Sequence, residues 1–132
     1  MKLLANCKIS PKGVYINGEL NSNFTDTDID WKKELYLKSG VDYPKFHKMD
    51  ALAKMAFLSF GMLSDKVDMT KFKDDDVVLL FANTSSSHTT DEKYITSYTE
   101  KGSPSPSLFV YTLPNILTGE LSILNKWYGE NI

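Results

Sequence analysis

Apolar and polar residues are arranged along the chain in a pattern that predicts short strands first and helices afterwards. Residues 2–9 and 13–20 each carry spaced apolar side chains. Between them, Ser10-Pro11-Lys12-Gly13 is a favourable turn sequence. The pattern predicts a hairpin, or two short strands, in this part of the chain.

A short helix is predicted after the polar stretch from Asn21 to Asp30. Its apolar positions are Trp31, Leu35 and Tyr36. Asp26 or Asp28 is a suitable cap for its first turn. Ser39-Gly40 is expected to end the helix, because glycine readily adopts the left-handed conformation found after helices.

The clearest helix in the sequence runs from Phe46 to Leu63. Residues of one helical face recur at the spacing of a buried stripe: Leu52, Met55, Ala56, Ser59, Phe60 and Leu63. Between Ala51 and Leu63, only Lys54 and Ser59 carry polar side chains. The pattern therefore predicts a helix that is buried nearly all round.

A continuous apolar run from Val77 to Ala82 follows the three aspartates at 74–76. Because it does not alternate with polar residues, it predicts a strand covered on both faces, as in the central parallel strands of layered α/β folds. A polar loop over 83–90 and a short helix over 92–99 come next. The prolines of 101–106 exclude a helix there.

The segment from Leu108 to Trp127 is mostly apolar, with helical spacing up to Asn125. Pro114 and Gly119 are expected to divide it, and Glu120 needs a polar partner or solvent. The predicted order, β-β-α-α-β-α-α, suggests one layered α/β domain over residues 1–132.

Composition and charge narrow the class of protein. The chain has 132 residues, of which 42% are hydrophobic and 24% charged, with a net charge of −2. These values indicate a single globular domain without the basic excess typical of nucleic-acid binders. No apolar run is long enough for a membrane span, and the N-terminal one is too short for a signal peptide. We expect a cytoplasmic protein.

Candidate chemical groups are few, and each has a plainer interpretation. Cys7 is better explained as a small core residue than as a nucleophile, because no base stands near it in the sequence. His88 lies with serines and Asp91 in one polar loop, where a catalytic triad is hard to assemble. His47 lacks the partners of a metal site, and Asp74-Asp75-Asp76 favours a solvated turn. We expect no catalytic set, metal or cofactor.

A resemblance appears in the last third of the chain. The stretch from Ser105-Pro106 to Asn115, with Gly119 four residues on and Gly129 ten further, resembles the β-ketoacyl-acyl-carrier-protein synthases. It looks closest to the small, divergent branch of that family called N-terminal-like domains, found near fatty-acid and aryl-polyene pathways.

Two earlier segments resemble the same family in the same order. Lys48-Met49-Asp50, leading into the helix that ends at Leu63, looks like the family's basic-x-x-Asp helix. Val77–Ala82, followed by the small polar residues 83–87, looks like its next strand and loop. The resemblance implies the N-terminal half of a thiolase-like layered α/β/α fold, with short strands and two buried helices, usually dimeric.

The resemblance does not carry the family's catalytic residues to this chain. In the family, a nucleophilic cysteine follows the glycine matched by Gly129, and its thiolate takes the acyl chain. Here Glu130 replaces the usual proline and the sequence ends at Ile132. Cys7 cannot stand in for that nucleophile, and the family's catalytic histidines match no residue.

Only supporting positions can be transferred from the family. Leu108 and Phe109 match a stretch that lines the acyl tunnel across the dimer interface. Asn115 and Gly119 match helix positions beneath the site, and Gly129 matches the glycine before the active-site strand. Core packing is the competing interpretation for these residues.

Three functions remain open from the sequence. The first is a non-catalytic ketoacyl-synthase-like domain of acyl-chain assembly, acting as an oligomer with acyl carrier protein or a complementary synthase subunit. The second is the N-terminal subunit of a split 3-oxoacyl-carrier-protein synthase, completed by a second chain. The third is a truncated remnant without a function of its own.

Overall fold

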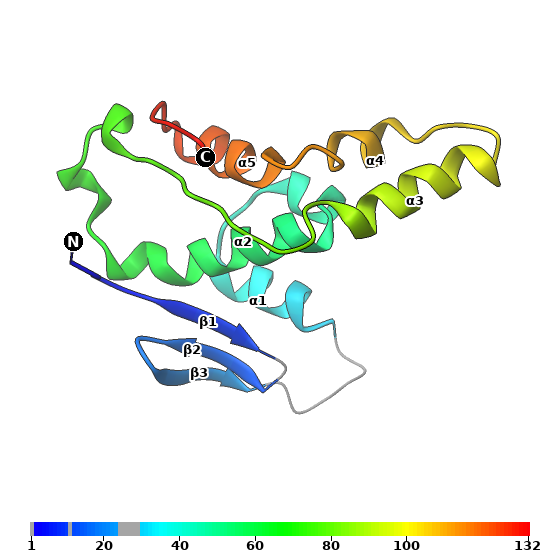
Figure 1. The fold of residues 1–132 in the computed structure, drawn as a ribbon. Coiled ribbons are helices and arrows are strands. Elements are labelled where there is room, and N and C mark those ends of the chain that lie inside the picture. The colour runs from blue at the N-terminus through cyan, green and yellow to red at the C-terminus, as the bar shows by residue number, and fades with distance from the viewer. Residues whose placement is uncertain (1, 11, 24–29) are drawn as a thin grey trace. The chain divides into compact units, whose positions relative to one another are not determined.

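The computed structural model describes residues 2–10, 12–23 and 30–132 (Figure 1). The chain divides into two compact units. The first unit comprises residues 1–44 and 54–71, and the second comprises 45–53 and 72–132. The mixed content of helices and a small sheet is compatible with the coarse α/β class, whereas the thiolase-like layering stays a prediction.

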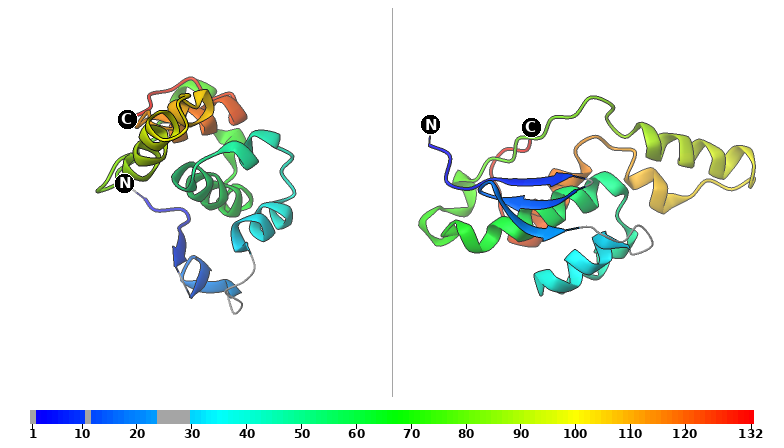
Figure 2. Two further views of the ribbon diagram at one scale, coloured as in Figure 1. Left: turned by 90° about the vertical axis from the view of Figure 1, so that its right-hand side faces the viewer. Right: turned by 90° about the horizontal axis from the view of Figure 1, so that it is seen from below.

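The first unit contains a three-stranded antiparallel sheet in chain order (Figures 1 and 2). Its strands are β1 (Cys7–Ser10), β2 (Gly13–Ile16) and β3 (Glu19–Asn23). The predicted hairpin is confirmed, since Ser10 pairs with Gly13. The prediction of one strand over 13–20 is wrong, because Asn17 and Gly18 both adopt positive φ, 52° and 88°, and form a second tight turn.

Helix α1 (Trp31–Ser39) confirms the short helix predicted after the polar stretch. The backbone carbonyl of Asp30 begins the helix by accepting hydrogen bonds from the N–H groups of Lys33 and Glu34, at 2.9 and 3.2 Å. Gly40 ends it in the left-handed conformation, with φ 66°. The proposed caps Asp26 and Asp28 lie outside the described residues.

The predicted helix over 46–63 divides in two. Pro44–Lys48 forms a 3₁₀ turn, and helix α2 runs over Ala51–Leu63. The division falls at Asp50, whose Oδ1 accepts the Ala53 N–H at 2.8 Å and so begins a new helix. Burial nearly all round holds in part: Ala53, Phe57 and Leu58 are buried, and most of the other residues are half-buried.

The first unit is held together by aromatic and aliphatic side chains of the sheet, α1 and the second part of α2. The Phe57 ring stacks on Tyr43 at 5.5 Å and contacts Tyr36 at 6.1 Å. Tyr36 Oη also accepts the backbone N–H of Tyr43 at 2.8 Å. Val14, Leu35 and Leu58 are the largely inaccessible aliphatic residues of this unit.

The second unit contains α3 (His88–Thr99), α4 (Pro106–Val110) and α5 (Ile116–Asn125). Helix α3 begins four residues before the predicted start. Pro106 is helical, contrary to prediction, because a first-turn residue needs no N–H bond. Pro114 separates α4 from α5 as predicted, but Gly119 lies inside α5 without interrupting it.

The prediction of a fully covered strand over 77–82 is wrong. Leu79 forms a single parallel bridge with Asn131, and the side chains of Val78 and Leu80 are 54% and 77% exposed. Within the described residues, only the segment at 130–132 pairs with this run. Across all the residues that the structure describes, no helix is long and apolar enough to cross a membrane.

Phe57→Asp is expected to unfold the first unit, because it places an unpaired carboxylate where the native ring is 2% exposed. The cost is roughly 4 kcal/mol or more. Thermal denaturation followed by circular dichroism measures it. Leu37→Asp is the control, since Leu37 is 68% exposed on α1. A cooperative melt of F57D near the wild-type midpoint would show that Phe57 is not buried.

Candidate functional site

Polar side chains gather in the second unit where α2 begins, α3 begins and α4 ends. Asp50 connects the first two: its Oδ1 caps α2 at Ala53, and its Oδ2 accepts the Thr90 hydroxyl at 2.8 Å. Ser87, buried just before α3, donates to the Thr112 carbonyl at 2.8 Å. These bonds join segments far apart in the sequence through groups that would otherwise be buried without partners.

A buried carboxylate lies beside this group. Glu120 of α5 is 6% exposed, and its Oε2 is 3.7 Å from Nζ of Lys45. The Tyr111 hydroxyl is 3.4 Å from Glu120 Oε1 and donates to it. The expectation that Glu120 requires polar partners is thus confirmed. Both partners come from outside α5, so the pair orients this helix against the segments that carry Lys45 and Tyr111.

Burial raises the pKa of Tyr111 to about 12, and the negative charges of Glu120 and Asp50 act in the same direction. At neutral pH the phenol therefore remains protonated and acts as a hydrogen-bond donor. A phenol held in this form is a poor general base. We define Lys45, Asp50, Thr90, Tyr111 and Glu120 as the polar cluster.

A cavity of about 10 Å³ adjoins the polar cluster. Asp50, Ser87 and Tyr111 are its polar lining residues, and the rest of the lining is apolar: Leu52, Ala53, Leu113, Pro114, Ile116 and Leu117. This volume has room for about one water molecule. The cavity is too small for an acyl chain or a nucleotide, and the hydrogen bonds of the polar cluster stabilise the unit.

Cys7 does not have the environment of a nucleophile. Its side chain is half-buried in β1, and this burial raises the pKa of the thiol. A hydrogen bond with Ser59 acts in the opposite direction but is the weaker effect. The thiol is therefore protonated at neutral pH, in agreement with the interpretation of Cys7 as a structural residue.

The serine, histidine and aspartate of the 85–91 segment do not form a triad. The Ser87 hydroxyl, whose shorter hydrogen bond is to the Thr112 carbonyl, lies 3.1 Å from Asp91 Oδ2 without an intervening histidine. The exposed His88 has its Nε2 3.4 Å from Oε1 of Glu92 and so faces a different carboxylate. The expectation of a solvated polar segment is confirmed for His88, whereas Ser87 and Thr90 are buried.

The residues considered as metal ligands, Asp74–Asp76 and His47, lie in other kinds of surroundings. Asp74–Asp76 forms an exposed 3₁₀ turn, and the Asp74 carbonyl accepts the Tyr128 N–H at 3.0 Å. Residues 2–10, 12–23 and 30–132 contain no group of three or more potential metal ligands. His47 lies edge-on to the Phe46 ring at 5.8 Å.

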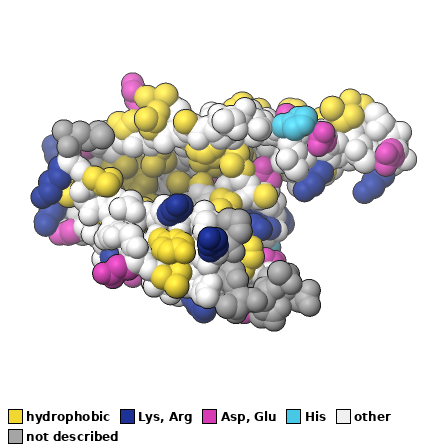
Figure 3. Space-filling model, turned by 60° about the horizontal axis from the view of Figure 1, so that its bottom comes forward, with side chains coloured by type: hydrophobic (Ala, Val, Ile, Leu, Met, Phe, Trp, Pro, Cys, Tyr) yellow, Lys and Arg dark blue, Asp and Glu magenta, His cyan; other side chains and the backbone are white. Residues whose placement is uncertain are grey.

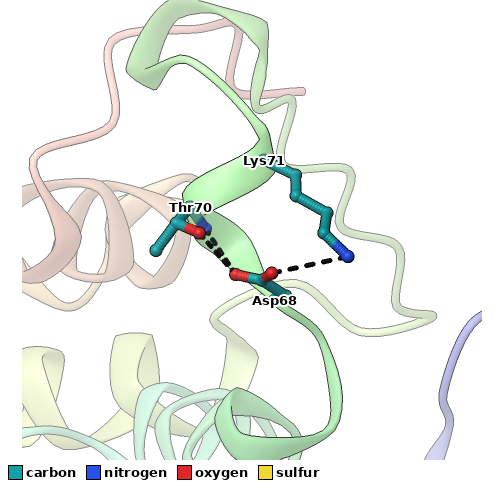
Figure 4. Close-up of polar contacts among 3 residues, drawn as sticks. All are labelled: Asp68, Thr70 and Lys71. Atoms are coloured by element: carbon teal, nitrogen blue, oxygen red, sulfur yellow. Dashed lines mark hydrogen bonds and ion pairs between the residues drawn. The ribbon is translucent and has the colours of Figure 1, made fainter.

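Asp68 forms the compact contact shown in Figure 4. Its Oδ1 accepts the Thr70 hydroxyl at 2.6 Å and the Thr70 N–H at 3.2 Å, and its Oδ2 is 3.4 Å from Lys71 Nζ. The hydrogen bond from Thr70 is the main cause that lowers the pKa of Asp68. The contact stabilises the short 3₁₀ turn at Met69–Lys71.

The predicted tunnel residues lie on α4. Leu108 is half-buried, whereas Phe109 is 52% exposed and its ring contacts Tyr94 of α3 at 5.6 Å. Helices α3 and α4 lie side by side (Figures 1 and 2). Neither Leu108 nor Phe109 lines the cavity beside the polar cluster. Their role in a tunnel stays a prediction.

The predicted supporting residues differ in their surroundings. Asn115 is exposed, and its backbone carbonyl accepts the Gly119 N–H at 3.1 Å at the start of α5. A Cβ on Gly119 would meet no atom within 4 Å. At Gly129, a Cβ would collide with the carbonyl of Val77 and lie 3.0 Å from that of Asp75. Of the three, only Gly129 is required by a close backbone approach.

Sequence reasoning missed the polar cluster as a unit. Its detectable signals were Glu120 within an apolar segment and Asp50 three residues before Ala53. Tyr111 and Thr90 carried no such signal, because tyrosine occurs at both exposed and buried positions and threonine is mostly exposed.

Comparisons with known proteins do not identify the chain. No protein-family model, no curated protein and no solved structure matches it.

Gly129→Ala and Gly119→Ala are expected to have opposite effects on stability. The first forces apart two backbone segments and should cost roughly 1–3 kcal/mol. The second removes a flexible residue from a helix that has room for a methyl group, and should stabilise by about 0.5–1 kcal/mol. Urea denaturation of both variants tests this. Equal destabilisation by the two would contradict the close approach at Gly129.

The polar cluster also predicts a pH dependence. Because the pKa of Tyr111 is raised above that of an unfolded tyrosine, about 10, its contribution to stability is intact below pH 10. That contribution is lost as the pH rises toward 12. The melting temperature of the wild type, relative to that of Tyr111→Phe, should therefore fall across this window.

Tyr98→Phe is the control, since Tyr98 is 45% exposed. The Tyr98→Phe variant should follow the wild type across the same window. Parallel pH profiles for the wild type and Tyr111→Phe would contradict the burial of the phenol beside Glu120.

Proposed function

We propose that this chain is a ketoacyl-synthase-like domain that takes part in acyl-chain assembly without acyl-transfer chemistry of its own. The observation that carries the proposal is the parallel pairing of residues 79–81 with residues 130–132. The first of these segments belongs to the run that resembles a strand of the synthase family. The second follows Gly129, which matches the family's conserved glycine.

Backbone geometry defines this pairing, which we call the parallel ladder. The Leu79 N–H donates to the Glu130 carbonyl at 2.9 Å, and the Ile132 N–H donates to the Leu79 carbonyl at 2.9 Å. The Phe81 N–H donates to the Ile132 carbonyl at 2.8 Å. Parallel pairs joined by intervening helices are typical of layered α/β folds.

The sequence between the paired segments also supports the proposal. Helices α3, α4 and α5 connect the two segments of the ladder, and Gly129 stands where the chain must pass closest to Val77. This glycine is the residue that the family resemblance singles out. A small residue is required there for a physical reason that is independent of the resemblance.

The described residues offer no acyl-transfer machinery. The thiol of Cys7 is protonated, and neither His88 nor Tyr111 is placed to act as a base on a substrate. A transferase needs a nucleophile, an activating base and an oxyanion site around one reacting atom. The proposed role is therefore that of a partner or scaffold, with acyl carrier protein or a complementary synthase subunit as its companion.

One observation favours the split-synthase alternative as a second candidate. Parallel strands are normally covered on both faces, yet Val78 and Leu80 are largely exposed on one face of the ladder. Hydrophobic side chains also reach the surface elsewhere on the molecule (Figure 3). A second polypeptide that covers this face would supply both the missing packing and the catalytic groups.

The purified chain is expected to produce no condensation product when incubated with malonyl- and acyl-loaded carrier protein. When affinity-tagged in its native host, it should instead co-purify with material that forms 3-oxoacyl-carrier protein from the same substrates. Mass spectrometry of the carrier protein measures both reactions. Condensation by the chain alone would overturn the non-catalytic role.

Leu80→Asp provides the matched variant, because it charges the exposed face of the ladder without disturbing a buried side chain. Co-purified activity should drop with L80D and persist with Leu37→Asp, which charges an exposed position of the first unit. A captured subunit that contains the active-site cysteine would favour the split synthase. Absence of any co-purified activity, together with a weak thermal transition, would favour a remnant.

A further inference from the structure

The chain begins with an exposed apolar segment at residues 2–6. It leads directly into β1 (Figure 1), and the side chains of Leu3 and Leu4 are 73% and 54% exposed. Residues 2–5 make no backbone hydrogen bond to any described residue. An extended apolar segment without backbone partners is suited to pairing with the edge of a sheet.

The pairing of Asn6 with Asn17 shows in which direction the backbone N–H and carbonyl groups of residues 2–5 point. The Asn17 N–H donates to the Asn6 carbonyl at 3.0 Å, and the Asn6 N–H donates to Asn17 Oδ1 at 2.9 Å. Asn6 therefore directs its polar groups toward β2. Because successive residues of an extended strand face opposite sides, Leu3 and Ala5 direct theirs toward the free side.

The parallel ladder has a complementary free edge. Leu79 and Phe81 direct their N–H groups toward 130–132. The intervening Val78 and Leu80 face the other way, and their N–H groups make no backbone hydrogen bond within the part of the chain that the structure describes. This edge is apolar and carries no charge between Val77 and Ala82.

The charges of the two segments are opposite. The ladder edge is preceded by Asp74, Asp75 and Asp76, all exposed, and its paired segment contains Glu130. No lysine or arginine occurs within 74–82 or 128–132. The N-terminal segment carries Lys2 and no acidic residue before β1. Complementary charge favours a parallel arrangement in which Lys2 lies near the aspartates.

We propose that residues 2–5 of one copy of this chain add as a parallel strand to the free edge at Val77–Phe81 of a second copy. The backbone directions require Ala5 to lie opposite Leu79, so that its N–H donates to the Val78 carbonyl and its carbonyl accepts the Leu80 N–H. The same register places Lys2 beside Asp76.

A reciprocal exchange between two copies is the simplest closed form of this arrangement. Each copy donates one N-terminal segment and accepts one at its ladder edge, so the contact closes without leaving a free segment. The strand exchange does not depend on the proposed function, because it uses the edge of the ladder and not its exposed face.

Cysteine cross-linking tests the register and the occupant together. In a Cys7→Ser background, Leu4→Cys in one chain lies opposite Val78→Cys in the other, within the range of a disulfide. Mixing the two single variants under mild oxidation should give a linked heterodimer. Leu37→Cys, also exposed in the first unit, should not link to Val78→Cys.

Two results would overturn the proposal. The first is a heterodimer yield no greater than that of the Leu37→Cys control. The second is an intrachain disulfide in the Leu4→Cys/Val78→Cys double variant at high dilution, which would show that the segment pairs within its own chain. Condensation activity is not involved, so the failure of this proposal is distinguishable from that of the proposed function.

Light scattering of the unmodified chain supplies a second measurement. A species of twice the 14.9 kDa chain mass is expected. Leu80→Pro removes the backbone N–H that would donate to the Ala5 carbonyl, but it spares the hydrogen bonds of Leu79 and Phe81 with residues 130–132. It should raise the dimer dissociation constant at least about fivefold. Leu80→Ala keeps the N–H and is the matched control. An equal effect of both, with unchanged melting curves, would contradict backbone pairing at this edge.

Discussion

The close approach of residues 128–132 to residues 74–81 is the constraint on which the arrangement of the second unit depends. The carbonyl of Val77 occupies the space that a side chain on residue 129 would need, so only glycine allows the two backbones to meet. Hydrogen bonds from Tyr128 to Asp74 and between Leu79 and Ile132 then set the register. Because the segments are parallel, α3, α4 and α5 must form the connection between them.

The polar cluster has a different role in the same unit. Asp50 and Glu120 are carboxylates that would be costly to bury alone, and each is satisfied by groups from other segments. Apolar contacts tolerate small shifts, whereas hydrogen bonds from Thr90 and Tyr111 require defined positions. The cluster therefore orients α3 and α5 relative to the start of α2. Its cavity has room for about one water molecule.

The ladder has two exposed surfaces, to which the two proposals assign different partners. Its face exposes the side chains of Val78 and Leu80 and is suited to hydrophobic cover by a companion subunit. Its edge exposes backbone donors beside an acidic run and is suited to a basic, apolar strand. The N-terminal segment of the same sequence has those properties. Assembly at the edge and assembly at the face are thus physically independent.

The helix at 31–39, the 92–99 part of α3, and the separation of α4 from α5 at Pro114 could be predicted from the sequence, because helix periodicity, Gly40 and the prolines act locally. The Asn17-Gly18 turn and the Asp50 cap also depend on residues close in sequence, but they were not predicted. The pairing and burial of Val77–Ala82 could not be predicted. A continuous hydrophobic run favours a strand buried on both faces, but its burial depends on which distant segments pack against it. The tertiary structure shows that, among the described residues, 130–132 pair with this run. Strand pairing joins residues that are remote in sequence and is decided by backbone register, so only the tertiary structure could show it.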